Sequence, residues 1–136
     1  MSRENVEVVR LAVEAWQRDD LETWLSLMDP DVEYHTAIER GLEGGASVYR
    51  GHDGIREFWT LRRTEVEDYL LESQELRDLP NGRVLHLTHI RWRGAASGIE
   101  LESPLGMVVT VRGGKIVRSV HYLSHEEALE AVGLRE

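Results

Sequence analysis

The sequence of 136 residues contains no cysteine, and it has no apolar run long enough to cross a membrane as a helix. The absence of cysteine excludes disulfides, thiol nucleophiles and zinc sites built on thiolates. No apolar segment follows the first residues, Met1–Asn5, so a secretory signal peptide is not predicted. We therefore expect a cytoplasmic protein without a membrane partner, whose chemistry depends on His, Asp, Glu, Tyr, Arg or Ser.

Basic residues are also few, with 16 Lys and Arg against 25 Asp and Glu and a formal net charge of -9. Because a nucleic-acid binder needs a basic surface, nucleic acid is not an expected partner. The length suits one hydrophobic core, and no linker or internal repeat divides the chain. We predict one domain over residues 1–136.

The spacing of apolar residues predicts the order of elements. Helical spacing runs from Ser2 to a break at residues 18–20, through a short second helix ending before Asp29, from Ile55 to Val66 after a side-chain cap by His52 or Asp53, and after Ser124 to Gly133. A short strand is expected over residues 31–36, a loop over 41–51, and four longer strands over 69–79, 83–93, 99–112 and 115–123. A bulge or bend is expected in the third of these at Pro104-Leu105-Gly106. The order α-α-β-α-β-β-β-β-α predicts an α+β fold with helices packed on a curved antiparallel sheet.

Four motifs occur within this order: Asp29-Pro30-Asp31-Val32, the segment 49–55 (Tyr-Arg-Gly-His-Asp-Gly-Ile), Gly114-Lys115-Ile116-Val117 followed by Tyr122, and the ending over residues 126–134. Together, over nearly the whole chain, they resemble the SnoaL-like branch of the NTF2-like superfamily. The resemblance implies a cone, in which a bent antiparallel or mixed sheet wraps around three N-terminal helices and leaves an apolar pocket open at one end. It also implies polyketide cyclase-like, isomerase, hydrolase or dehydratase activities, or no catalysis, since members differ in function.

The resemblance also implies that the outer sheet face pairs two subunits. Alternation along residues 83–93 places Leu85 and Leu87 on one face of the strand and Ile90 and Trp92 on the other. We assign Ile90 and Trp92 to the outer face, where they predict a homodimer.

By the same resemblance, the acids of epoxide-hydrolase members correspond to His89, Arg91 and His121, none of which is a carboxylate. All seven Asp residues are expected in helix starts, turns or loops, so a cofactor-free isomerase or cyclase needs another base. His121 is the candidate, because imidazole titrates near neutral pH. Arg91, with His89, would then bind a carboxylate, enolate or oxyanion. In the alternative, both histidines are structural and Arg91 pairs with Glu100 or Glu102.

A small, largely apolar organic ligand is the predicted partner. Its pocket is expected to be lined by aromatic residues and one methionine: Trp16, Tyr34, Tyr49, Phe58, Trp59 and Met107. In the alternative these residues are plain core, which is the commoner role of aromatic residues at helical spacing. No metal or other cofactor is predicted, because His86 and His89 are three apart on a strand and no His-Glu-x-x-His helix occurs. The alternative to an enzyme is a ligand-binding or dimeric assembly module without catalysis.

Overall fold

The structure is a computed structural model that describes residues 2–37 and 47–134. Four helices and six strands make up these residues: α1 (Ser2–Gln17), α2 (Leu21–Ser26), β1 (Met28–Thr36), β2 (Ser47–Arg50), α3 (Gly51–Glu65), β3 (Val66–Leu79), β4 (Arg83–Gly94), β5 (Glu100–Arg112), β6 (Lys115–Tyr122) and α4 (His125–Ala131), with a 3-10 turn, η2 (Pro80–Gly82). The predicted α+β order is confirmed, with one added strand, β2.

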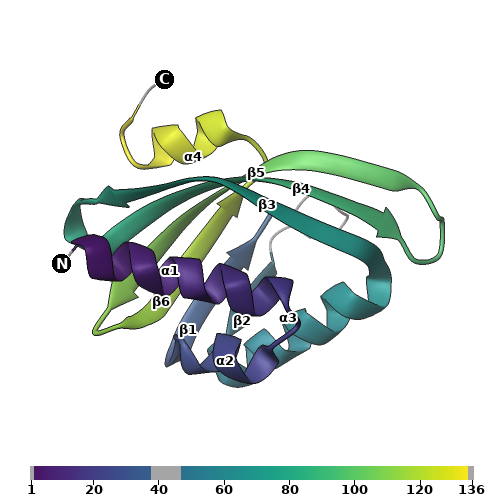
Figure 1. Cartoon of the computed structure of the whole chain (residues 1–136), viewed down its shortest axis with the longest axis horizontal. Coiled ribbons are helices and arrows are strands. Elements are labelled where there is room, and N and C mark those ends of the chain that lie inside the picture. Colours follow the sequence, from purple (N-terminus) through teal and green to yellow (C-terminus); the bar gives the residue numbers. More distant parts are fainter. Residues whose placement is uncertain (1, 38–46, 135–136) are drawn as a thin grey trace.

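The strands form one mixed sheet in the order β2-β1-β6-β5-β4-β3. Only the β1–β6 pair is parallel among the described strands. The sheet curves, with α1, α2 and α3 on its concave side and α4 on its convex side (Figure 1). The predicted arrangement of three N-terminal helices inside a curved sheet is therefore confirmed.

The short strand β2 lies in the segment that the sequence predicts as a loop. Residues 41–46 of that segment lie outside the described residues, whereas Ser47–Arg50 pairs antiparallel with the end of β1. Four residues are too few for a visible alternation pattern, so only the pairing partner reveals the strand. The pairing places Tyr49 directly opposite Tyr34.

Local capping and turn chemistry explains most element boundaries. The Asp20 carboxylate accepts a hydrogen bond from the Thr23 N–H at 3.1 Å, and the Ser124 hydroxyl accepts one from the Glu127 N–H at 3.0 Å. Asn81 and Gly82 have φ values of 66° and 75°, which suit the tight turn into β4. The predicted side-chain cap of α3 is wrong, because His52 instead bonds the Met28 carbonyl oxygen at 2.9 Å.

Of the predicted bulge or bend at Pro104-Leu105-Gly106, the bulge is absent, because the β4–β5 register runs without a shift past the His89–Pro104 pair. Proline is tolerated there because Pro104 lies beyond the last β5–β6 pair, Gly106–Tyr122, so the edge of β5 that faces β6 is unpaired at that point. The shift in β5 lies instead between Thr110 and Val111.

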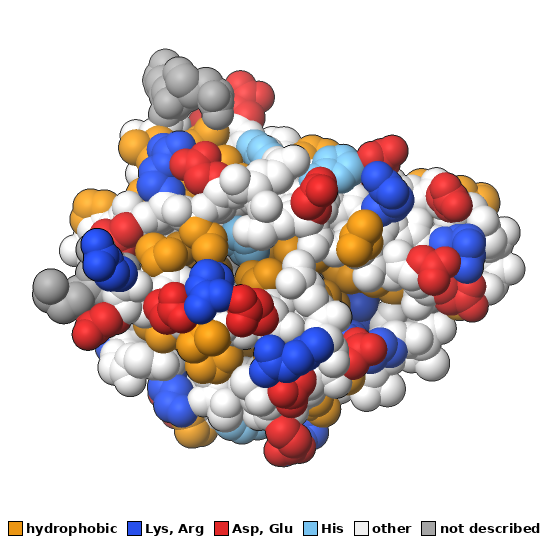
Figure 2. All heavy atoms as spheres, viewed as in Figure 1, with side chains coloured by type: hydrophobic (Ala, Val, Ile, Leu, Met, Phe, Trp, Pro, Cys, Tyr) orange, Lys and Arg blue, Asp and Glu red, His pale blue; other side chains and the backbone are white. Residues whose placement is uncertain are grey.

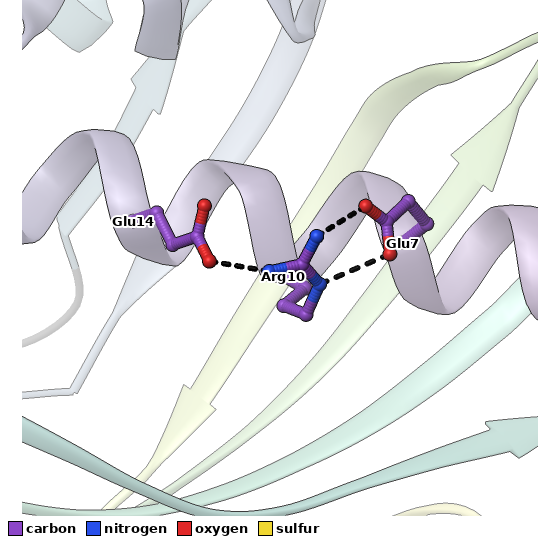
Figure 3. Close-up of polar contacts among 3 residues, drawn as sticks. All are labelled: Glu7, Arg10 and Glu14. Atoms are coloured by element: carbon purple, nitrogen blue, oxygen red, sulfur yellow. Dashed lines mark hydrogen bonds and ion pairs between the residues drawn. The ribbon is translucent and has the colours of Figure 1, made fainter.

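Helix α1 separates a buried face from a charged one. Val9, Ala12 and Trp16 are buried in the main core. On the solvent side, Arg10 lies between Glu7 and Glu14 and bonds both (Figure 3). Acidic and basic side chains are interspersed over the same face of the molecule (Figure 2). Such exposed pairs contribute little to stability, so packing of the apolar face holds the helix in place.

The convex face has its own smaller core beneath α4. Leu85, Leu87 and Val108 pack there with Ala128 and Leu129 of the helix. Ile90 and Trp92 lie on the opposite side, where Ile90 is fully buried in the main core. The assignment of Ile90 and Trp92 to the outer face is therefore wrong, because alternation defines two faces but does not say which one the three helices cover.

Candidate functional site

A cavity of about 60 Å³ lies between the concave face of the sheet and helices α1 and α3. Most of its wall is aliphatic or aromatic, and none of its described lining residues is Asp or Glu. The polar exceptions come from four strands and α3: Tyr34, Thr36, Arg62, Tyr69, His86, Ser119 and His121. The wall is thus apolar with a few polar groups, two of them histidines and one an arginine.

The sheet register aligns two of these histidines in one row. Met107 on β5 pairs with His86 on β4 at one side and with His121 on β6 at the other. Paired residues in neighbouring strands point to the same face, so all three face the cavity. Since strands lie about 4.8 Å apart, the two histidines are about 10 Å apart along the row, with Met107 between them.

His121 is buried on the cavity wall, as the predicted general base requires. Its ring meets that of Tyr34 edge to face, with the centroids 4.8 Å apart. Tyr34 comes from β1, the strand parallel to β6, so the pair depends on the one parallel contact of the described sheet. The structure therefore gives the His121 ring a fixed aromatic neighbour inside the cavity.

His86 is more deeply buried, with 1% of its surface exposed. Its Nε2 lies 2.8 Å from the hydroxyl oxygen of Ser73 on β3, while its buried Nδ1 has no hydrogen-bond partner among the described residues. Burial lowers the pKa of His86 to about 4, because the charged ring would lose its hydration. The ring is therefore neutral near pH 7, and its Nδ1 is a polar atom that an occupant of the cavity could satisfy.

Arg62 brings the one positive charge among the described lining residues that is permanent at neutral pH. Only 7% of its surface is exposed, and its guanidinium lies over the Phe58 ring at 4.9 Å and near the Tyr69 ring at 5.8 Å. Phe58 is one helical turn before Arg62 on α3, so the helix itself places the aromatic face beneath the cation.

The other two predicted catalytic residues do not reach this cavity. His89 and Arg91 lie on the convex face of β4, opposite His86 and Ile90. The His89 Nε2 lies 3.2 Å from the Glu102 Oε1 on β5. Arg91 is exposed and stands opposite Glu102 in the β4–β5 register. Their expected place in the pocket is wrong, for the same reason as that of Ile90 and Trp92: the wrong face of the strand was taken as the inner one.

The predicted ligand-binding residues divide into two groups. Trp16, Tyr34, Phe58 and Met107 lie on the cavity wall. Tyr49 and Trp59 are buried in the core behind it: Tyr49 packs on Phe58 at 5.3 Å, and Trp59 on Trp16 at 5.2 Å. Any ligand contact of this second group would therefore be indirect.

Sequence reasoning did not select Arg62 and His86 as site residues, although a signal was present for each. Arg62 continues the apolar stripe of α3 after Phe58, and a charged residue on a buried stripe marks a functional candidate. His86 shares its face of the strand with Val84 and Ile90, so a correct choice of the inner face would have identified it. The prediction that every Asp lies in a helix start, turn or loop is wrong for four of the seven, which lie in strands: Asp29, Asp31, Asp68 and Asp78.

Neither a metal centre nor a membrane span is found in the described part of the chain. Within residues 2–37 and 47–134, no three His, Asp or Glu side chains are grouped so that they could hold a metal ion. None of the described helices is long and apolar enough to cross a membrane.

Comparison with known proteins identifies the fold. The family model of the SnoaL-like domain matches residues 9–119. The structure resembles an NTF2-like protein of unknown function from Burkholderia pseudomallei, with a TM-score of 0.78 and 22% identity over 96% of this chain and 98% of the other. No curated protein matches the sequence.

Two similar structures contain small molecules. TerC, co-crystallised with polyporic acid, has a TM-score of 0.77 and 25% identity over 95% of this chain and 97% of its own. A protein with a ketosteroid isomerase-like fold from Catenulispora acidiphila, in complex with trimethylamine, has a TM-score of 0.73 and 17% identity over 94% and 93% of the two chains.

Proposed function

Because this chain belongs to the SnoaL-like domain family, we propose that it binds a small, largely apolar organic molecule between its helices and sheet, and that His121 performs cofactor-free acid–base chemistry on it. The reaction class is isomerisation, cyclisation or hydration. We also propose that residues 1–136 form one domain. The observation that carries it is the buried His121 ring on the wall of an otherwise apolar cavity.

The cavity wall supports the choice of ligand. Aromatic rings from α1, α2, β1 and α3 surround it, and aromatic walls with a few oriented polar groups are typical of sites for ring-containing ligands. TerC, at 25% identity, was co-crystallised with polyporic acid, which favours an organic ligand in the same fold.

The chemistry would divide among three side chains. His121 takes a proton from one atom of the ligand and returns it to another, so the imidazole ends neutral and no redox partner is needed. Arg62 takes the role first assigned to Arg91 and stabilises the negative charge that develops on the ligand. His86, neutral near pH 7, offers its Nδ1 for a hydrogen bond to the same molecule.

Binding without catalysis is the second candidate, and the size of the cavity favours it. Ligand sites usually enclose roughly 300–1,000 Å³, whereas this one encloses about 60 Å³. A ring-sized ligand must therefore displace side chains, and binding alone demands a less exact placement of the ligand than catalysis does. A homodimer also remains a prediction, now without the support of Ile90 and Trp92, and light scattering at micromolar concentration tests it.

The function is tested by a thermal-shift screen of steroid, terpene, polyketide and aromatic-acid libraries, since a ligand of the native state raises the melting temperature. For any compound that is turned over, His121→Ala is expected to abolish turnover while the protein still folds, and His89→Ala serves as the matched control on the other face of the sheet. Full activity of His121→Ala would leave only the binding function.

A further inference from the structure

A second hollow adjoins the cavity on the outside of the molecule. It encloses about 390 Å³ where the end of α1, the end of α3 and the start of β3 meet. Four residues line both spaces: Trp16, Arg62, Tyr69 and Leu71. We call the outer space the groove, and the inner one remains the cavity. A single layer of side chains separates them.

Three of the four shared side chains, all except Leu71, end in flat groups that pack against one another. The Trp16 and Tyr69 rings meet edge to face at 5.6 Å, and the Arg62 guanidinium lies beside Tyr69. Rotation of these side chains about their side-chain bonds would join the cavity to the groove without movement of the backbone.

The rim of the groove is held by ion pairs. Asp19 bonds Arg63, whose guanidinium also lies 3.5 Å from the centroid of the Trp59 ring system. Asp68 bonds Arg93 at 2.6 Å. Asp19 and Asp68 both have a positive φ, 59° and 53°, a conformation that costs free energy for a residue other than glycine and persists where the surroundings hold it. The rim is thus a defined surface and not a frayed edge.

Two arginines line the groove, Arg62 more than nine-tenths buried and Arg63 at the rim. The side chains of Asp19 and Asp68 are 76% and 68% exposed, so water screens their charge. A guanidinium presents several N–H donors in a fixed planar arrangement that suits a carboxylate or a similar acidic group. The two arginines therefore favour an acidic group in the groove.

We propose that the cavity and the groove are two compartments of one site for an elongated organic anion, with its apolar ring in the cavity and its acidic group in the groove beside Arg62 and Arg63. This inference rests on the proposed function and adds the class of ligand: an aromatic or alicyclic acid. The cavity alone is too small for such a molecule, whereas the groove has the volume of an ordinary ligand site.

Two fluorescent probes that share one aromatic skeleton test the proposal: 1-anilinonaphthalene-8-sulfonate, an anion, and N-phenyl-1-naphthylamine, which lacks the sulfonate. The key variant is Leu70→Glu, which adds a negative charge to the groove wall at a side chain already exposed to solvent. Its matched control is Leu101→Glu, the same change at an exposed leucine of β5 that does not line the groove. Ala12→Leu fills part of the cavity from α1.

We expect the sulfonate probe to bind more tightly than the neutral one. Leu70→Glu should lower the affinity for the sulfonate probe about fivefold through charge repulsion, while the affinity for the neutral probe changes by less than about twofold. Leu101→Glu should change neither affinity. Ala12→Leu should weaken both probes. Unchanged near-ultraviolet circular dichroism of each variant confirms that the probes report a folded site and not a molten state.

If Leu70→Glu and Leu101→Glu change the affinity for the sulfonate probe equally, the two-compartment site is wrong. If Ala12→Leu still lowers the probe affinity in that case, the proposed function is unaffected. Equal affinity of the two probes, or no binding of either, would overturn the anionic ligand class. A sulfonate probe that responds to Leu70→Glu but not to Ala12→Leu would occupy the groove alone, which contradicts a shared site. Failure of the proposed function is distinct: no compound of the thermal-shift libraries would then bind.

Discussion

The buried His86 should make the protein lose stability on mild acidification. In the folded protein the pKa of His86 lies at about 4, because burial disfavours the charged ring, and its ordinary value is 6.5. The unfolded chain therefore binds a proton at a higher pH than the folded protein does. The contribution of His86 to stability is fully present above about pH 6.5, falls as the pH drops toward about 4, and does not change further below that value.

The size of the effect follows from the two pKa values. One pKa unit corresponds to about 1.4 kcal/mol, so the difference between 6.5 and about 4 corresponds to ~3 kcal/mol in the free energy of unfolding. Domains of this size are stable by about 5–15 kcal/mol in total. Acidification to about pH 4 therefore removes a large part of the stability, because His86 takes up its proton in the unfolded chain at a higher pH than in the folded protein.

Urea unfolding followed by tryptophan fluorescence, from about pH 7 to about pH 4, measures the effect in the wild type and in His86→Phe. Carboxylates such as Glu33, whose pKa is lowered first by its hydrogen bond with His35, lose their contribution in both proteins, so they cancel in the difference. The difference between the two stability curves should change by ~3 kcal/mol across this range. His89→Phe, on the opposite face of β4, controls for replacing any histidine of this strand.

Parallel curves for the wild type and His86→Phe would refute the reasoning. They would mean that the imidazole of His86 takes up its proton equally readily in the folded and unfolded states, which a ring enclosed between Ser73 and the cavity should not do.

Two further predictions concern packing and charge. Gly106→Ala should lower the free energy of unfolding by about 1–3 kcal/mol, because the added Cβ would lie 2.5 Å from the Cβ of Ala128 on α4. Urea unfolding measures the loss, and the second change Ala128→Gly should recover most of it. An undiminished loss in the double variant would contradict this contact. Arg62→Met should weaken binding of the anionic naphthalene probe about tenfold. Arg91→Met, on the exposed convex face, should leave the affinity of the probe unchanged. Fluorescence titration compares the two variants, and equal effects would mean that Arg62 is not part of the site.

Local sequence signals were sufficient for most of the secondary structure. Asp and Ser are favourable N-cap residues in any protein, and Asp20 and Ser124 cap α2 and α4 here. Asn81-Gly82 and Gly113-Gly114 supply the positive φ values that tight hairpin turns require. These preferences act over a few residues, so they can be identified without the fold. The short strand β2 was missed because its stability comes from pairing with β1 and not from its own residues.

The candidate site was predicted only in part, because one ambiguity affected several residues at once. A strand alternates with a period of two, so a wrong choice of inner face exchanges every side chain. That choice placed His89 and Arg91 in the pocket and left out His86, which the structure places on the cavity wall. His121 was identified from the family resemblance and from the chemistry of imidazole, and its position on the wall agrees with that choice.

The sequence by itself determined which elements form, in what order, and which residue types are available for chemistry. It also indicated that cysteine chemistry is absent, since no thiol exists to perform it. Only the tertiary structure decided which face of β4 is covered by α1 and α3 and which by α4, and hence which histidines share a cavity with Arg62. The physical reason is that both faces of this strand carry large apolar residues, so either face could be buried, and the helix that packs against each face defines the inside.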